Sequence, residues 1–208
     1  MKQLLFLIIL MPFFGVSQMN FEKELDSVNS KREAEIFIES NKNTKGKILT
    51  FNKEKHKTRL ADELFKLSKG GKKIIKSNYK TTYYKVLDKD KVVHERVNYI
   101  LFDSSKKSLS EINTLRDKII VKHKDGFDFK TLAKYYSMDI NGKKGGDSGW
   151  FESKVMPAKF EQEVKNHNIN DIFMVDIAED NAYYVILKSH EPKTIEEITV
   201  LKFSETRN

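Results

Sequence analysis

The residues whose types could do chemistry are gathered in one stretch of the sequence, from Asp139 to Phe160. A loop in this stretch holds four glycines, at positions 142, 145, 146 and 149, where the backbone can adopt angles closed to other residues. Met156 and Phe160 follow, four residues apart near the start of a helix. A carboxylate, a thioether and a phenyl ring offer electrostatic stabilisation and apolar binding. Each feature alone is weak, because a methionine and a phenylalanine on a helix are usually core.

Composition excludes other kinds of chemistry. The 208 residues include no cysteine, so we expect no disulfide, no thiolate metal site and no redox chemistry by the protein itself. The histidines show no ligand spacing, so we expect no metal and no cofactor. They are predicted to be surface or edge residues: His56, His94, His123, His167 and His190.

The second half of the chain alternates strands and helices that would position this stretch. An apolar strand is predicted over 97–102, followed by a helix with Ser108 and Glu111 at capping-box spacing. A second helix, capped by Asp128, carries one buried stripe at i, i+3, i+4 and i+7: Phe129, Leu132, Ala133 and Tyr136. The remaining predicted elements are a short strand at 150–151, a helix with Pro157 in its first turn, and strands over 172–177 and 183–187.

The first half predicts a helix, strand, helix, strand order. One amphipathic helix is expected within 21–40, a strand over 48–51, a helix from Leu60 to Gly70-Gly71, and a strand over 81–87. The last three of these elements follow the same order as the strand at 150–151, the Pro157 helix and the strand at 183–185. The first half is therefore a degenerate copy of the second, or the similarity is a coincidence between two common patterns. The second alternative is supported by the absence of a glycine-rich loop before Ile48.

The segment 97–191 resembles the parvulin-type peptidyl-prolyl cis/trans isomerases, over a little under half of the chain. Residues 129–137, FKTLAKYYS, look like the family's second helix, and residues 145–151, GGDSGWF, look like its GGDLGWF signature. Met156 and Phe160 fall where the family places its proline-pocket pair, and residues 182–186, AYYVI, sit where it has GYHII. Several motifs in the expected order make an accidental likeness improbable.

The resemblance implies rotation about an X-Pro amide, over a barrier of about 18–20 kcal/mol, without a covalent intermediate or cofactor. Met156 and Phe160 would form the apolar seat of the proline ring, with Leu132 or Trp150 behind it. Asp139 lies where the family has a catalytic Cys or Asp, and its role would be electrostatic. The alternative is that Asp139 only caps a turn in a polar loop.

The sequence departs from the family at its two buried histidines. The matching positions here are Tyr99 and Tyr184, whose hydroxyls can join one hydrogen-bond network with Asp139 but do not titrate near neutral pH. Activity would then persist at a reduced level, or be lost and leave a domain that binds prolyl or hydrophobic segments without isomerising them.

The predicted fold class is α+β. We expect a parvulin-like antiparallel sheet of about four strands with three to four surrounding helices, preceded by a smaller helix-strand-helix-strand region. The predicted divisions are a signal peptide over 1–17, an N-terminal α/β region over 18–95, the isomerase-like domain over 96–191, and a C-terminal strand or tail over 192–208.

The N-terminus has the layout of a secretory signal. Lys2 supplies a positive start, and an apolar run over 4–14 is too short for a membrane span, which needs about 20 residues. We therefore predict an exported protein, periplasmic or extracellular, with no stable membrane insertion after cleavage. The net charge of +8 is spread among acidic residues and forms no long basic block, so we expect no nucleic-acid partner.

Two functions of different classes follow from the sequence. The first is an extracytoplasmic folding factor with prolyl isomerase activity, whose clients are proline-containing polypeptides. The second is a non-catalytic chaperone or peptide-binding module that uses the same groove, a reading favoured by the tyrosines at positions 99 and 184.

Overall fold

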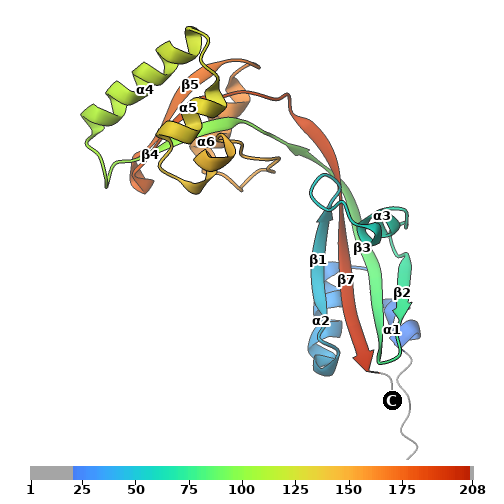
Figure 1. Ribbon diagram of the computed structural model, residues 1–208. Helices are drawn as coiled ribbons and strands as arrows, with labels where there is room; N and C mark the ends of the chain where they lie inside the picture. The colour runs from blue at the N-terminus through green and yellow to red at the C-terminus, as the bar shows by residue number, and fades with distance from the viewer. Residues whose placement is uncertain (1–20, 207–208) are drawn as a thin grey trace, which may run out of the picture.

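Two antiparallel sheets organise residues 21–206, the part of the chain that this computed structural model describes (Figure 1). One sheet has four strands in the order β1-β7-β3-β2, and the other has three in the order β4-β6-β5. Each sheet belongs to its own lobe, and the lobes are joined where β3 runs on toward β4 and where the chain returns into β7 (Figure 1). The strands are β1 Lys47–Asn52, β2 Lys72–Lys76, β3 Lys80–His94, β4 Asn98–Asp103, β5 Ile172–Ile177, β6 Ala182–Leu187 and β7 Lys193–Thr206.

Six α-helices flank the sheets in the described part of the chain. They are α1 Phe21–Ser27, α2 Lys31–Ser40, α3 Arg59–Phe65, α4 Leu109–Lys124, α5 Phe129–Tyr136 and α6 Ala158–Asn166. Three short 3-10 turns complete the set: η1 Lys42–Thr44, η2 Ile140–Lys144 and η3 Ala178–Asp180. The predicted α+β class is confirmed.

The three-stranded sheet is packed on both faces, as its alternating side chains require. Ile100 and Phe102 of β4 belong to a core shared with α4 and α5, whereas Tyr99 and Leu101 pack into a second core that contains Phe160 of α6. Asp147 forms an isolated bridge with Asn98 at the start of β4, and Phe151 forms another with Glu95 just before it. The predicted antiparallel sheet is therefore present, with three strands and these two bridges.

Helix starts in this lobe follow the predicted caps. The Ser108 hydroxyl accepts a hydrogen bond from the Glu111 N–H, and the Glu111 carboxylate accepts one from the Ser108 N–H, which completes a capping box. Asp128 accepts a bond from the Thr131 N–H at 3.0 Å and so starts α5. These caps fix where α4 and α5 begin.

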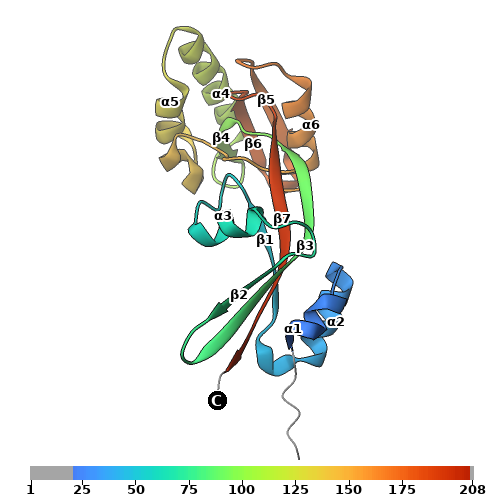
Figure 2. The ribbon, with the colours of Figure 1, turned by 90° about the vertical axis from the view of Figure 1, so that its right-hand side faces the viewer.

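The four-stranded sheet is likewise covered on both faces (Figure 2). One face carries α1 and α2 over Tyr83, Leu87 and Phe203, and the other carries α3 over Tyr84 and Val200. The C-terminal strand β7 lies between β1 and β3, so residues 21–94 complete their sheet only with a strand from the far end of the sequence. The domain boundaries and the relation between the two halves remain predictions.

Two local expectations were wrong, and one strand was missed. The single helix within 21–40 is two helices, because the Ser30 hydroxyl accepts from the Glu33 N–H and the Glu33 carboxylate from the Asn29 N–H, which together start α2. His94 is buried, not at the surface, and its ring contacts Asn52 and Glu197. Strand β2, with three lysines among its five residues, was not predicted.

No helix within residues 21–206 is long and apolar enough to cross a bilayer. The predicted signal peptide over 1–17 lies outside the described residues.

Candidate functional site

Asp139 is the polar centre of the predicted site. One carboxylate oxygen, Oδ1, accepts hydrogen bonds from the Ser137 hydroxyl at 2.8 Å and from the Gly142 N–H at 3.2 Å, and so caps η2. The other, Oδ2, accepts from the Tyr99 hydroxyl at 3.0 Å. The two readings of Asp139 are therefore compatible, because one oxygen starts the turn while the other faces β4.

The two tyrosines at the positions where the resemblance leads us to expect histidines lie side by side. The rings of Tyr99 and Tyr184 meet edge to face with centroids 5.7 Å apart, and each also meets the ring of Phe160, at 5.9 and 5.1 Å respectively. This edge-to-face geometry is favourable for aromatic rings. The Tyr184 hydroxyl has no hydrogen bond to any described residue, so the expected three-member network reduces to the Tyr99–Asp139 pair.

Both phenols stay protonated over the physiological range. Burial, with the Asp139 carboxylate as second cause, raises the pKa of Tyr99 well above its ordinary value. Burial first and the charge of Asp139 second also raise the pKa of Tyr184. At neutral pH the site therefore holds two neutral hydroxyl groups and no imidazole that could titrate there.

The predicted seat for a proline ring is only half open. Met156 borders a hollow of about 510 Å³ that is also lined by Ala158 and Gln162. Phe160 is 0% exposed and lies under the rings of Phe151, Tyr99 and Tyr184. The expected apolar seat is thus only partly accessible, since Met156 lines the hollow whereas Phe160 is covered by neighbouring rings.

Leu132 and Trp150 are not brought to this seat. Leu132 packs in the core shared with α4 and α5, on the opposite face of the sheet from Phe160. Trp150 lies beside the connections between the lobes, with its ring 5.7 Å from that of His190 and with Arg96 and Lys193 over its faces. The expectation that either residue backs the seat is therefore wrong in this structure.

The glycine-rich loop holds the site together by touching β4 closely. Gly146 has φ of 74°, and a Cβ atom there would lie 2.2 Å from the Tyr99 carbonyl oxygen. The Tyr99 N–H donates to the Gly146 carbonyl at 2.8 Å, and the Asn98 amide donates to the Gly145 carbonyl at 2.9 Å. Only glycine combines this backbone angle with this contact, so the loop sets the position of Tyr99.

Two further site contacts were missed by the sequence analysis. Arg96 clamps Asp147 of the glycine-rich motif with two nitrogen–oxygen contacts of 2.9 and 2.5 Å, and this guanidinium lowers the pKa of Asp147. Ser137 donates to Asp139 and also accepts from the Leu101 N–H at 3.0 Å. The motif marked Asp147, but nothing in the sequence pointed to Arg96, which is 51 residues away.

Within residues 21–206, no group of three or more His, Asp or Glu side chains is placed to hold a metal ion. The arrangement at Asp139 is suited to binding and electrostatic stabilisation, with a fixed carboxylate beside neutral hydroxyl groups.

The family model for the PPIC-type PPIASE domain matches residues 81–193. Chaperone SurA of Vibrio cholerae is 29% identical over 114 residues, 53% of this chain and 26% of SurA, and Chaperone SurA of Vibrio vulnificus is 31% identical over 91 residues, 44% and 21%. The chain thus spans about a quarter of the length of these curated relatives.

Among solved structures, PrsA from Bacillus subtilis is 28% identical with a TM-score of 0.39, over 47% of this chain and 35% of PrsA. The family resemblance read from the sequence is confirmed by the match to the domain model, which spans more than half of the residues. The chain therefore belongs to the PpiC-type, or parvulin, peptidyl-prolyl isomerase family.

Proposed function

We propose that the chain is a peptidyl-prolyl cis/trans isomerase that acts as an extracytoplasmic folding factor on proline-containing polypeptides. The observation that carries this proposal is the hydrogen bond from Tyr99 to Asp139 within a parvulin-family domain. This polar pair supports the proposal, because the resemblance leads us to expect the family's catalytic residues at these positions, with tyrosines in place of both histidines. Met156, which packs against the same core cluster as Tyr99, lines a hollow that supplies an apolar surface.

The proposed mechanism is preferential binding of the twisted amide. Rotation removes the resonance between the prolyl nitrogen and the carbonyl, so the charges on both atoms change as the bond twists. A fixed Asp139 carboxylate, held by three donors, can respond to that change without reorganising. About 1.4 kcal/mol of extra stabilisation of the twisted form gives a tenfold rate increase.

A protease-coupled assay on a proline peptide tests this function. We expect Asp139→Asn, which keeps the shape and removes the charge, to lower kcat/KM by about tenfold or more. The matched control is Asp117→Asn, on the exposed face of α4, which should leave the rate within about twofold. A wild-type rate equal to background at high protein concentration would reject isomerase activity.

A second function is favoured by one specific observation, the complete burial of Phe160. A buried Phe160 ring supports a chaperone whose domain binds client segments without isomerising their prolyl bonds. Similarity to proteins named Chaperone SurA supports client binding in either case. Suppression of aggregation that is weakened by Met156→Ala and unchanged by Asp139→Asn, in a protein without measurable turnover, would select this function.

The extracytoplasmic location rests on the predicted signal sequence at the N-terminus. Cell fractionation of the full chain tests it, with the precursor and the processed form distinguished by mass. Recovery of unprocessed chain in the cytoplasmic fraction alone would count against it.

A further inference from the structure

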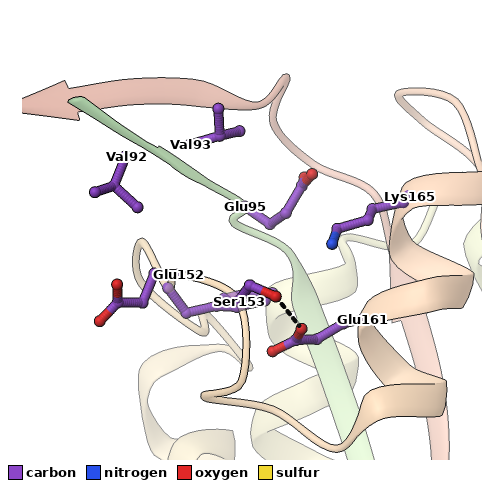
Figure 3. A pocket seen from close by; sticks show the side chains of 8 residues that line it. Val92, Val93, Glu95, Glu152, Ser153, Glu161 and Lys165 are labelled. Carbon is purple, nitrogen blue, oxygen red and sulfur yellow. Dashed lines mark hydrogen bonds between the residues drawn. The ribbon is translucent and has the colours of Figure 1, made fainter. Parts of the chain in front are cut away.

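Three hollows follow one another along α6, away from the aromatic cluster. The Met156 hollow shares Ser153, Glu161 and Lys165 with a second hollow of about 380 Å³, which is drawn in Figure 3. That second hollow shares Glu95 and Lys165 with a third of about 340 Å³. Together they form a trough, which we call the α6 trough, from Met156 to the junction of the lobes.

The second hollow lies along an open strand edge. It is lined by both Val92 and Val93 of β3, whose side chains point to opposite faces of the sheet, so the hollow touches the edge between those faces. Strand β2 pairs with β3 only from Thr81 to Lys85, and β7 occupies the other edge up to His94. From Asp88 to His94, β3 therefore has one paired and one open edge among the described strands.

One antiparallel backbone pair is already formed at the end of this open edge. Glu95 and Phe151 exchange two backbone hydrogen bonds of 2.9 Å each, so the peptide groups of Glu95 point away from β7. On a regular strand Val93, two residues earlier, presents its N–H and C=O in the same direction. The chain after Phe151 then turns away, with Lys154 at φ of 74°, and leaves that position unpaired.

Lys165 is the only side chain that lines all three hollows of the α6 trough. Its ammonium group is directed toward the space between Glu95 and Glu161 (Figure 3) and has no ion-pair partner among the described residues. Both neighbouring carboxylates are already engaged. Glu95 pairs with Lys188 at 2.7 Å, and Glu161 accepts bonds from the Met156 N–H at 3.0 Å and the Ser153 hydroxyl at 3.2 Å.

We infer that the α6 trough binds an extended segment of a client polypeptide, which adds as a strand to the open edge of β3 at Val93. This inference rests on the proposed client-binding function. An extended backbone is the ligand that an unpaired edge recognises, and the apolar walls take alternate side chains of such a segment. Lys165, which has no ion-pair partner among the described residues, can pair with an acidic residue of that segment.

Two peptides distinguish binding along the α6 trough from binding at the prolyl site alone. The short peptide is a tetrapeptide that contains proline. The long peptide extends it by about eight residues on each side, which is ~25 Å of strand. Each extension has apolar residues in alternation and one glutamate. Affinity for both peptides is measured by fluorescence anisotropy, and turnover of the short peptide by the protease-coupled assay.

Val93→Pro and Lys165→Glu are the test variants. Proline removes the edge N–H at a position where edge strands tolerate it, and Val93→Thr is the control that keeps the N–H. We expect each test variant to weaken binding of the long peptide by about fivefold to tenfold, and Val93→Pro, which lies outside the Met156 hollow, to keep short-peptide turnover within about twofold of wild type. Lys165→Arg should retain the affinity, and thermal unfolding of each variant verifies its fold.

Equal affinity of wild type for the long and short peptides would overturn the inference, as would unchanged long-peptide binding by folded Lys165→Glu. A wild-type dimer that Val93→Pro converts to monomer, with peptide binding unaffected, would assign the edge to a second copy and also overturn it. Absence of short-peptide turnover with variant-sensitive binding of the long peptide would instead reject the isomerase function and support the trough.

Discussion

At the scale of single residues, the site depends on the hydroxyl of Tyr99. Its bond to Asp139 joins β4 to the loop that follows α5, across 40 residues of sequence. Replacing it with Phe should lower the free energy of unfolding by about 1–2 kcal/mol, the range for a hydrogen bond to a charged group. Denaturant unfolding measures this, with Tyr136→Phe as a control expected within about 0.5 kcal/mol, and equal losses in both variants would contradict the assignment.

The same residue predicts how stability depends on alkaline pH. The folded-state pKa of Tyr99 lies above its value of 10.0 in an unfolded chain, so the folded state binds the phenolic proton more tightly. This contribution is complete below about pH 10 and is lost as pH rises toward the folded-state pKa. Unfolding free energies measured between about pH 8 and 11 should fall, and should fall less steeply in Tyr99→Phe.

At the scale of elements, the glycine-rich loop is the part that tolerates least change. Gly146→Ala places a Cβ atom against the Tyr99 carbonyl oxygen in a backbone conformation with positive φ. Gly149→Ala shares the positive φ of 64° but has no atom within 4 Å of the added Cβ. We expect about 1 kcal/mol of destabilisation for Gly149→Ala and at least about 3 kcal/mol for Gly146→Ala, which thermal unfolding compares directly. Equal losses would show that the contact with β4 is unimportant.

The elements of the second lobe could be predicted because their apolar side chains follow the periods of strands and helices. Ile100 and Phe102 alternate with Tyr99 and Leu101, and the caps at Ser108 and Asp128 start helices as expected. Elements of the first lobe were missed because charged residues interrupt the apolar patterns that would predict them. The break before α2 lies among charged residues, and β2 consists largely of lysines. The burial of Phe160 depends on rings from three other segments, which no spacing reveals.

At the scale of the whole molecule, the folded structure of the first lobe should depend on β7 and that of the second lobe should not. Ending the chain at residue 192 removes the shared neighbour of β1 and β3 and leaves the β4-β6-β5 sheet complete. We expect the first lobe to lose its hydrogen-exchange protection while β4, β5 and β6 keep theirs. A chain ending at residue 206 is the control. Loss of protection in both lobes of the shorter chain would show that they fold as one unit.

The central place of β7 also bears on biosynthesis. A nascent chain emerges from its N-terminus, at about 5–20 residues per second, so Tyr83, Leu87 and their neighbours appear well before Leu201 and Phe203, which cover them. The isomerase lobe, contiguous in sequence, can form during that interval. The first lobe therefore keeps an open gap in its sheet, with unpaired edges on β1 and β3, until β7 is available.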